Sequence, residues 1–414
     1  MTEAGSKMIE TTAGRVPVES LGKTLSHEHL RAGNEGIRRQ WPHLFDFDEE
    51  VAMIAAEVRS AQAHGVETVC DPSCMDLDRD VRFNIAVAAA TGMRFVMATG
   101  IYGQAYETVP PVLARRPNWE DYLAELFVHD LQVGIQETSV KAAFLKCAAD
   151  KPGLTPHMEK VHRAAARASL ATGAPIMAHS DPNSGTGIEQ MRLFLEEGVA
   201  PELVVIAHTG DTDDLDYIER LLDLGCYIGL DRYGSDRFLP LERRHVTTLA
   251  LLERGHGPRM MLGQDAVISL DIRHDPPFAA HITQIFEVAI PELVRRGADP
   301  DMLDRMVGAN VRSWLAGEAP APAGEEAPAG EEAPVAFVKA DRSLCIGSGQ
   351  CSALAPRQFR LGPDDRVEVI GAGAVPPADA DVVADAVQLC PVEAISMDSG
   401  RPGQAPTGKE GGGV

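Results

Sequence analysis

The stretch Ala142-Ala-Phe-Leu-Lys146 is a short apolar run that ends in a charged residue. Runs of this kind predict buried β-strands. The pattern recurs, and between successive runs lie roughly 20 to 40 residues with helical periodicity, such as residues 49–64 and 156–172. Eight strand-helix repeats predict an α/β fold, a (β/α)8 or TIM barrel, in residues 1–316. The runs end near His29, Asp71, Tyr102, Lys146, His179, His208, Asp231 and Asp265.

Several of these run-ending residues are types that bind metal ions. In a (β/α)8 barrel the carboxyl ends of all strands meet at one mouth, so residues far apart in the sequence become neighbours. Imidazole and carboxylate groups are common ligands of divalent metals. We therefore expect a site for two metal ions at this mouth. The candidate ligands are His27, His29, Lys146, His179, His208 and Asp265.

The single residues each allow another interpretation. His27 and His29 lie two apart in one expected strand, so both imidazoles point to the same face, but two polar residues at a strand end look alike. His179 and His208 could be buried, hydrogen-bonded histidines, and Asp265 could cap a helix. The coincidence of all five at one barrel mouth favours metal binding.

Lys146 helps to distinguish a metal site from a set of ordinary buried polar residues. An ammonium group that faces two metal ions would be repelled, so Lys146 must lose its charge in order to take part. A desolvated lysine near cations has a lowered pKa and is nucleophilic. Its amine can take up carbon dioxide to form a carbamate, whose two oxygens can bridge two metals. The alternative is a lysine held in a salt bridge.

A change of composition marks a domain boundary. Residues 317–334 repeat Glu, Ala, Pro and Gly without a large apolar residue, so they cannot form a core, and we expect a flexible acidic linker. Residues 335–399 are then a small second domain. The Gly- and Pro-rich tail, residues 400–414, is expected to be disordered.

The net charge of −23 is shared by both parts of this 414-residue chain. Nucleic acid and anionic membranes are therefore not expected as partners, because both require a basic surface. No segment approaches the roughly 20 apolar residues of a membrane helix, and no secretory signal is visible at the amino terminus. We expect a cytoplasmic protein whose seven cysteines are free thiols or metal ligands rather than disulfides.

The second domain carries the motif Cys345-Ile-Gly-Ser-Gly-Gln-Cys351, followed later by Cys390-Pro391. It resembles bacterial ferredoxins, in which Cys-x2-Cys-x2-Cys and a distant Cys-Pro bind iron and sulfide. Ser348 replaces the middle cysteine. The resemblance implies an α+β ferredoxin-like domain with a [3Fe-4S] cluster on Cys345, Cys351 and Cys390, as in the small ferredoxins that serve actinobacterial cytochromes P450. Zinc is the alternative, although three cysteines without a nearby histidine make a poor tetrahedral site.

The first domain resembles the phosphotriesterase family from Met8 to about Ala316. Leu21-Gly-Lys-Thr-Leu-Ser-His-Glu-His-Leu30 looks like the opening signature of that family, and Gly210-Asp-Thr-Asp-Asp214 is similar to another of its motifs. The resemblance implies two divalent metal ions, zinc in the first place, with cobalt, manganese or iron as alternatives. It assigns His27, His29 and Asp265 to the more buried metal. It assigns His179 and His208 to the other metal, and carbamylated Lys146 to the bridge between the two.

The same resemblance implies the reaction. A hydroxide that bridges the two metals attacks the substrate, one metal polarises the oxygen of the bond under attack, and Asp265 takes the proton and passes it toward Asp211.

Two further residues favour lactones over phosphotriesters as substrates. Tyr102, in Thr99-Gly-Ile-Tyr102, resembles the tyrosine of the lactonase branch, where phosphotriesterases have tryptophan. Arg232 similarly stands where phosphotriesterases have histidine. Alternatively, Tyr102 could be a wall residue bonded to the backbone, and Arg232 could pair with Asp231 or Asp236. We expect N-acyl-homoserine or related lactones as substrates, with phosphotriester hydrolysis as the alternative.

A hydrolase needs no electrons, so the second domain leaves three hypotheses. The ferredoxin could supply a redox partner such as a ferredoxin reductase or a cytochrome P450. The chain could be mainly an electron carrier on a degenerate barrel, which the intact ligand set disfavours. The cluster could also be a structural or redox-sensing appendage. A homodimer is possible.

Overall fold

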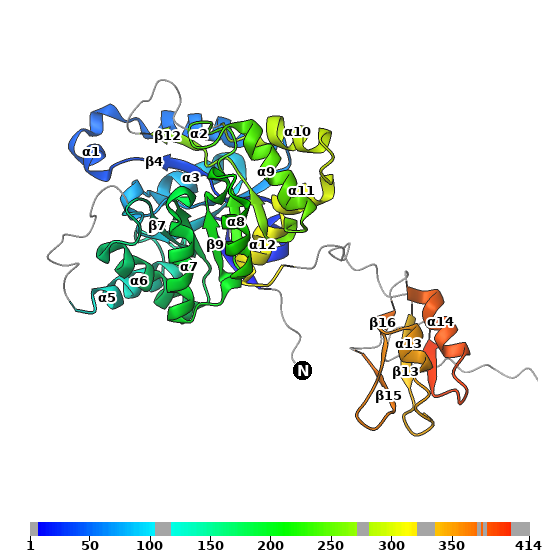
Figure 1. The fold of residues 1–414 in the computed structure, drawn as a ribbon. Helices are drawn as coiled ribbons and strands as arrows, with labels where there is room; N and C mark the ends of the chain where they lie inside the picture. Colours follow the sequence, from blue (N-terminus) through cyan, green and yellow to red (C-terminus); the bar gives the residue numbers. More distant parts are fainter. Residues whose placement is uncertain are drawn as a thin grey trace, which may run out of the picture. The chain divides into compact units, whose positions relative to one another are not determined.

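The computed structural model describes residues 7–103, 117–270, 281–320, 336–370, 374–375 and 379–398, without the side chains of residues 35, 337, 381 and 398. The chain divides into two compact units, Met1–Ala323 and Gly324–Val414 (Figure 1). Most of the expected linker and the whole of the expected tail lie outside the described residues.

The first unit contains a sheet of eight parallel strands that curls into a near-closed barrel with helices on its outside, as the strand-helix repeat predicted (Figure 1). Sheet neighbours follow the order of the chain, so each strand pairs with the strand of the preceding repeat. The barrel strands are β3 (Lys23–Leu25), β5 (Val66–Asp71), β6 (Arg94–Gly100), β7 (Ala142–Ala149), β8 (Ile176–Ser180), β9 (Val204–Ala207), β10 (Tyr227–Leu230) and β11 (Met260–Leu262).

The two helices expected from periodicity are present as α2 (Phe47–Gln62) and α6 (Pro156–Thr172). The side chain of Asp46 accepts a hydrogen bond from the backbone of Glu49 and caps α2, and Thr155 caps α6 in the same way. Among the described helices, none combines the length and apolar character needed to cross a bilayer. The remaining α-helices are α1 (Glu35–Gln40), α3 (Val81–Thr91), α5 (Trp119–Gln132), α7 (Thr186–Glu197), α8 (Leu215–Asp223), α9 (Leu241–Glu253), α10 (Ile290–Arg295), α11 (Pro300–Met306) and α12 (Ala309–Ala316).

Alternate residues of the strands pack in two apolar clusters. In β7, Phe144 belongs to the smaller cluster with Trp314 of α12, and its neighbour Leu145 belongs to the larger one. The indole N–H of Trp314 donates to the carbonyl of Leu203, which directly precedes β9. The aromatic packing therefore lies toward the amino ends of the strands and leaves their carboxyl ends for polar side chains.

The first barrel strand is interrupted, which corrects one expectation. β3 ends at Leu25 and β4 (His29–Ala32) pairs in parallel with β12 (Val267–Leu270), so His27 lies in the interruption and does not share a strand with His29. Glu28 is fully buried there and accepts hydrogen bonds from Gln264 Nε2 at 2.6 Å and from the backbone of Ala266 at 2.7 Å. A hairpin of β1 (Met8–Thr11) and β2 (Gly14–Pro17) precedes the barrel.

The second unit is a small α+β domain, as expected. Its strands form one sheet in the order β16-β13-β17 and a separate β14-β15 pair. Its buried core includes Phe359, Val367 and Ile395 together with Cys351. The elements are β13 (Ala336–Ala340), α13 (Gln350–Leu354), β14 (Phe359–Leu361), β15 (Val367–Val369), β16 (Ala374–Val375), α14 (Ala380–Gln388) and β17 (Ile395–Asp398).

Candidate metal centre

Three of the predicted histidine ligands are held in the same way. The Nδ1–H groups of His27 and His208 donate to the two carboxylate oxygens of Asp231, at 2.8 and 3.0 Å. The Nδ1–H of His29 donates to Ser73 Oγ at 2.8 Å, because that hydroxyl itself donates to the carbonyl of Arg31. A partner on Nδ1 fixes the tautomer and leaves Nε2 with its lone pair, which is the state a metal ligand requires.

The Nε2 atoms of these histidines face Asp265. They lie 3.5 Å from its Oδ1 for His27 and His29, and 4.0 Å from its Oδ2 for His208. His208 Nε2 is buried without a hydrogen-bond partner among the described residues, and buried nitrogens rarely lack one. Ligand atoms of His27, His208 and Asp265 all lie within 4.8 Å of one another. This geometry fits a cation between them.

The electrostatics suit ligands rather than charged histidines. Burial lowers the pKa of His29 to about 3 and that of His179 to about 4, and it lowers the pKa of His208 well below its usual range. Burial opposes ionisation of Asp265, but its electrostatic interactions with neighbours, among them Arg232, outweigh burial and hold the pKa of that carboxyl below its ordinary value. His29, His179 and His208 are therefore neutral imidazoles, and Asp265 is a carboxylate.

Lys146 lies within β7 and is fully buried, with an exposed fraction of 0%. Its Nζ is 3.2 Å from His27 Nε2, and burial lowers its pKa to about 8. Among the ion pairs that the structure describes, none involves Lys146, so the salt-bridge alternative has no support. A buried amine with a lowered pKa is partly neutral at physiological pH and can act as a nucleophile.

His179 stands beside this group rather than within it. Its ring centroid is 4.3 Å from that of His208, and its Nε2 lies 3.5 Å from Asp150 Oδ1. Tyr102, two residues beyond β6, places its hydroxyl 3.2 Å from His179 Nδ1. The Tyr102 hydroxyl therefore lies at the edge of the candidate centre. The alternative interpretation, a wall residue with its hydroxyl bonded to the backbone, does not hold.

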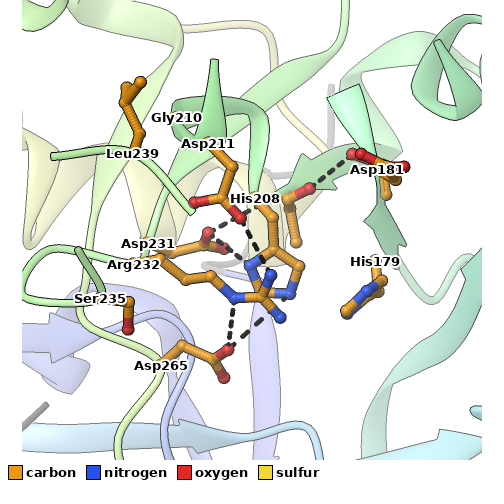
Figure 2. Close-up of polar contacts among 12 residues, drawn as sticks. His179, Asp181, His208, Gly210, Asp211, Asp231, Arg232, Ser235, Leu239 and Asp265 are labelled. Atoms are coloured by element: carbon orange, nitrogen blue, oxygen red, sulfur yellow. Dashed lines mark hydrogen bonds and ion pairs between the residues drawn. The ribbon is translucent and has the colours of Figure 1, made fainter. Parts of the chain in front are cut away.

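Arg232 connects two carboxylates at the mouth. Its Nε donates to Asp265 Oδ2 at 2.8 Å and its Nη1 to Asp211 Oδ2 at 2.9 Å, as Figure 2 shows. The expected alternative pairing with Asp231 or Asp236 is therefore wrong. The structure also corrects the expected relay from Asp265 to Asp211, because a guanidinium, which keeps its protons, lies between the two carboxylates. Asp211 accepts a further hydrogen bond from Arg244 Nη2 at 2.7 Å.

Sequence reasoning missed the residues that hold the ligands. Asp231 directly follows β10 and is buried, and the neighbouring histidines keep its pKa well below the usual range although burial opposes this. Asp231 stands at the end of an apolar run in the sequence. A metal-binding aspartate would stand at the same place, so the sequence could not distinguish a residue that supports a ligand from the ligand itself. Ser73 and Asp150, which contact His29 and His179, gave no signal of their own.

In the second unit, Cys345, Cys351, Cys390 and Ser348 line one pocket. The backbone N–H of Val367 donates to Cys345 Sγ at 3.2 Å, and that of Ala394 donates to Cys390 Sγ at 3.3 Å. Such donors stabilise the negative charge of cluster-bound sulfur. The residues present therefore fit an iron–sulfur cluster. The four other cysteines are buried in the first unit.

Comparisons with known proteins match both units of the chain. The chain matches the model of the Phosphotriesterase family over residues 7–315 and that of the 4Fe-4S single cluster domain over residues 338–397. An aryldialkylphosphatase of Saccharolobus solfataricus is 43% identical over 312 residues, which are 73% of this chain and 98% of that protein. A phosphotriesterase homology protein of Mycobacterium tuberculosis is 36% identical over 315 residues, 73% of this chain and 96% of that protein.

A solved structure extends the match to the fold. The phosphotriesterase from Mycobacterium tuberculosis has a TM-score of 0.71 at 34% identity, and the match covers 76% of this chain and all of that one. Proteins of this family bind a pair of divalent metal ions, and the second domain indicates an iron–sulfur cluster. The chain belongs to the phosphotriesterase family of metal-dependent ester hydrolases and carries a 4Fe-4S single-cluster ferredoxin domain at its carboxyl end.

Proposed function

We propose that the barrel opens lactones, N-acyl-homoserine or related lactones, in preference to cleaving phosphotriesters. The observation that carries this proposal is the Tyr102 hydroxyl at the edge of the candidate metal centre, 3.2 Å from the His179 ring. Burial raises the pKa of Tyr102, so the hydroxyl keeps its proton and can donate it in a hydrogen bond. A donor aimed at the oxyanion that forms when a lactone carbonyl is attacked lowers the barrier of that step.

Six residues of the chain would hold the two metal ions. When bound, two divalent cations lower the pKa of a shared water and polarise the substrate oxygen. The buried Lys146 amine, with its pKa lowered to about 8, supports carbamate formation. Its lone pair forms an N–C bond to carbon dioxide, one C=O π bond breaks and leaves the negative charge on oxygen, and the proton lost from the nitrogen passes to water. The proposed ligands are His27, His29, carbamylated Lys146, His179, His208 and Asp265.

The other polar residues of the mouth orient Asp265 and the substrate. Asp265 takes up the proton released by the attacking water. Arg232 fixes the direction of that carboxylate through its Nε, and Asp211 anchors Arg232 from the far side. The guanidinium also lies 4.3 Å from the ring centroid of Phe238, whose exposed fraction is 40%. This apolar surface beside the mouth suits the acyl chain of a lactone.

Phosphotriester hydrolysis is the second candidate, because the relative that is 43% identical bears the name aryldialkylphosphatase. The test compares kcat/KM for N-acyl-homoserine lactones and for paraoxon, using protein loaded with zinc, cobalt or manganese. We expect the lactone value to be much higher, and Tyr102→Phe to lower it by about 10² or more because an oxyanion donor is lost. Tyr122→Phe, which changes a tyrosine with an exposed fraction of 49%, is the matched control. A higher kcat/KM for paraoxon would assign the triesterase function instead.

For the second domain we propose a [3Fe-4S] cluster that transfers electrons to a redox partner such as a ferredoxin reductase or a cytochrome P450. Ser348 supports the three-iron form, because among the described residues it lines the pocket together with three cysteines. Protein purified without air should show the near-isotropic electron paramagnetic resonance signal of an oxidised three-iron cluster. Zinc in place of iron, or a four-iron signal in wild-type protein, would contradict this assignment.

A further inference from the structure

We propose that Asp76 is a positioning residue that aims Tyr102 at the metal centre. Asp76 lies in the short 3-10 helix η3 (Met75–Leu77), in the segment that follows β5, whereas Tyr102 follows β6. The contact between them therefore joins two neighbouring strand-helix connections at the barrel mouth. The geometry is independent of the substrate, and only its effect on lactones rests on the proposed function.

The Asp76 carboxylate binds two successive backbone amides. Its Oδ1 accepts the N–H of Tyr102 at 2.8 Å, and its Oδ2 accepts the N–H of Gly103. β6 ends at Gly100, so these amides lie beyond the hydrogen-bond ladder of the barrel. Two bonds from one rigid carboxylate fix both the position and the direction of this peptide segment, which the sheet itself no longer does.

The direction of that segment decides where the Tyr102 hydroxyl lies. The tyrosine ring meets the His179 ring edge-on, with 4.9 Å between centroids, and its hydroxyl lies beside the imidazole. Gly103, the second residue bound by Asp76, adopts a left-handed backbone with φ of 63°. A misplacement of about 1 Å at a reacting group can lower the rate 10²-fold, so a support of the backbone matters to a residue that acts through its hydroxyl.

The position of Asp76 is in turn fixed by contacts of its own short segment. The Cys74 thiol donates to Asp76 Oδ1 at 3.3 Å. The backbone N–H of Leu77 donates to the carbonyl of Cys74, and the carbonyl of Leu77 accepts the N–H of Gly33, which directly follows β4. The short helix is therefore tied to the first strand-helix connection as well. Asp76 transmits that rigid arrangement to the loop that carries Tyr102.

Asp76→Asn in the full-length, metal-loaded protein tests the role. The amide oxygen can still accept one N–H, but the amide NH2 then faces the other donor, so one backbone bond is lost. We expect faster hydrogen exchange at the amides of Tyr102 and Gly103 with unchanged metal content. We also expect kcat for the lactone to fall about 10- to 100-fold, because a shift of about 1 Å in the Tyr102 hydroxyl can lower the rate by that order. The control is Asp80→Asn, the same substitution in the same loop. Its amide oxygen can still accept the N–H of Arg82, and only the ion pair with the exposed Arg82 side chain is lost, so kcat and the exchange of the Tyr102 and Gly103 amides should stay unchanged.

A double-mutant cycle separates positioning from general stability. If Asp76 acts through the Tyr102 hydroxyl, Asp76→Asn should change kcat by less than about twofold in the Tyr102→Phe background, because interacting residues are not additive. Full additivity, or unchanged amide exchange in Asp76→Asn, would overturn the proposal. If Asp76→Asn does not fold, the same measurements are made on Asp76→Glu, which keeps the charge and moves the carboxylate by one methylene. If the wild-type protein prefers triesters, the proposed function fails, and the exchange data and a cycle with the triester still decide the role of Asp76.

Discussion

Replacing Asp231 by asparagine is the sharpest test of the candidate metal centre, because this one carboxylate holds two histidines. Oδ1 accepts both the Nδ1–H of His208 at 3.0 Å and its backbone N–H at 2.8 Å, whereas Oδ2 accepts one bond from the described residues, the Nδ1–H of His27. In Asp231→Asn we expect the amide oxygen to keep the Oδ1 position, where two donors point. The amide NH2 then faces His27 Nδ1.

This change should switch the tautomer of His27. To accept the new N–H, His27 Nδ1 must lose its proton, and the ring then carries its proton on Nε2, the atom that faces Lys146 and Asp265. A protonated Nε2 cannot bind a metal. Loss of an outer partner of this kind lowers metal affinity about 10- to 100-fold, or roughly 1.4 to 2.7 kcal/mol. Asp231→Ala removes the support of both histidines, so about 10² to 10⁴ is expected if the two effects multiply.

The measurement is a zinc titration of chelator-treated protein against a competing chelator, with metal content determined after dialysis. The matched control is Asp236→Asn, which alters an exposed carboxylate of the same loop that binds the backbone of Leu241. Wild-type zinc affinity and a full metal content in Asp231→Asn would refute the reasoning. Either His27 would then not be a ligand, or its tautomer would not be set by Asp231.

The remaining predictions concern the lysine and the cluster. Lys146→Ala should lose both metals and hydrolase activity, and added short carboxylic acids with metal should partly restore them by replacing the carbamate; retention of two metals by metal analysis would contradict this role. Cys345→Ser, Cys351→Ser or Cys390→Ser should lose the brown colour and unfold the second domain in absorbance and circular dichroism spectra. The lactonase rate should stay near the wild-type value, and a rate that falls with the cluster would argue against independent sites. Ser348→Cys should shift the paramagnetic resonance signal toward a four-iron cluster.

The sequence predicted the barrel because its strands are buried on both sides and end in polar residues. His179 and His208 lie near the end of β8 and directly after β9, as the apolar runs indicated, whereas β7 continues to Ala149, three residues beyond Lys146. The interruption between His27 and His29 could not be predicted in this way. It depends on Glu28, whose buried carboxylate binds Gln264 and Ala266 more than 200 positions away in the sequence.

For the candidate site, too, the sequence indicated what depends on neighbouring residues and not what depends on contacts between distant positions. Residue types and run ends were enough to select the candidate ligands. They could not show that Asp231 supports His27 and His208, because an aspartate after an apolar run is the same pattern whether it binds a metal or a histidine. The partners of Arg232 were also beyond local information, since Asp211 and Asp265 come from two other strand-helix connections.

The two sites differ in what holds their ligands, and this difference predicts how each domain depends on its metal. The supports of the histidine site are buried groups at strand ends, such as Asp231 and Ser73, and the large apolar clusters of the barrel do not include the ligands. In the second unit, Cys351 itself belongs to the small buried core, and Cys345 and Cys390 pack against that core. A domain of this size has little apolar burial to spare, so the free energy of cluster binding is part of its folding free energy. The barrel should therefore keep its fold when its metals are removed, whereas the ferredoxin domain should lose its fold together with its cluster.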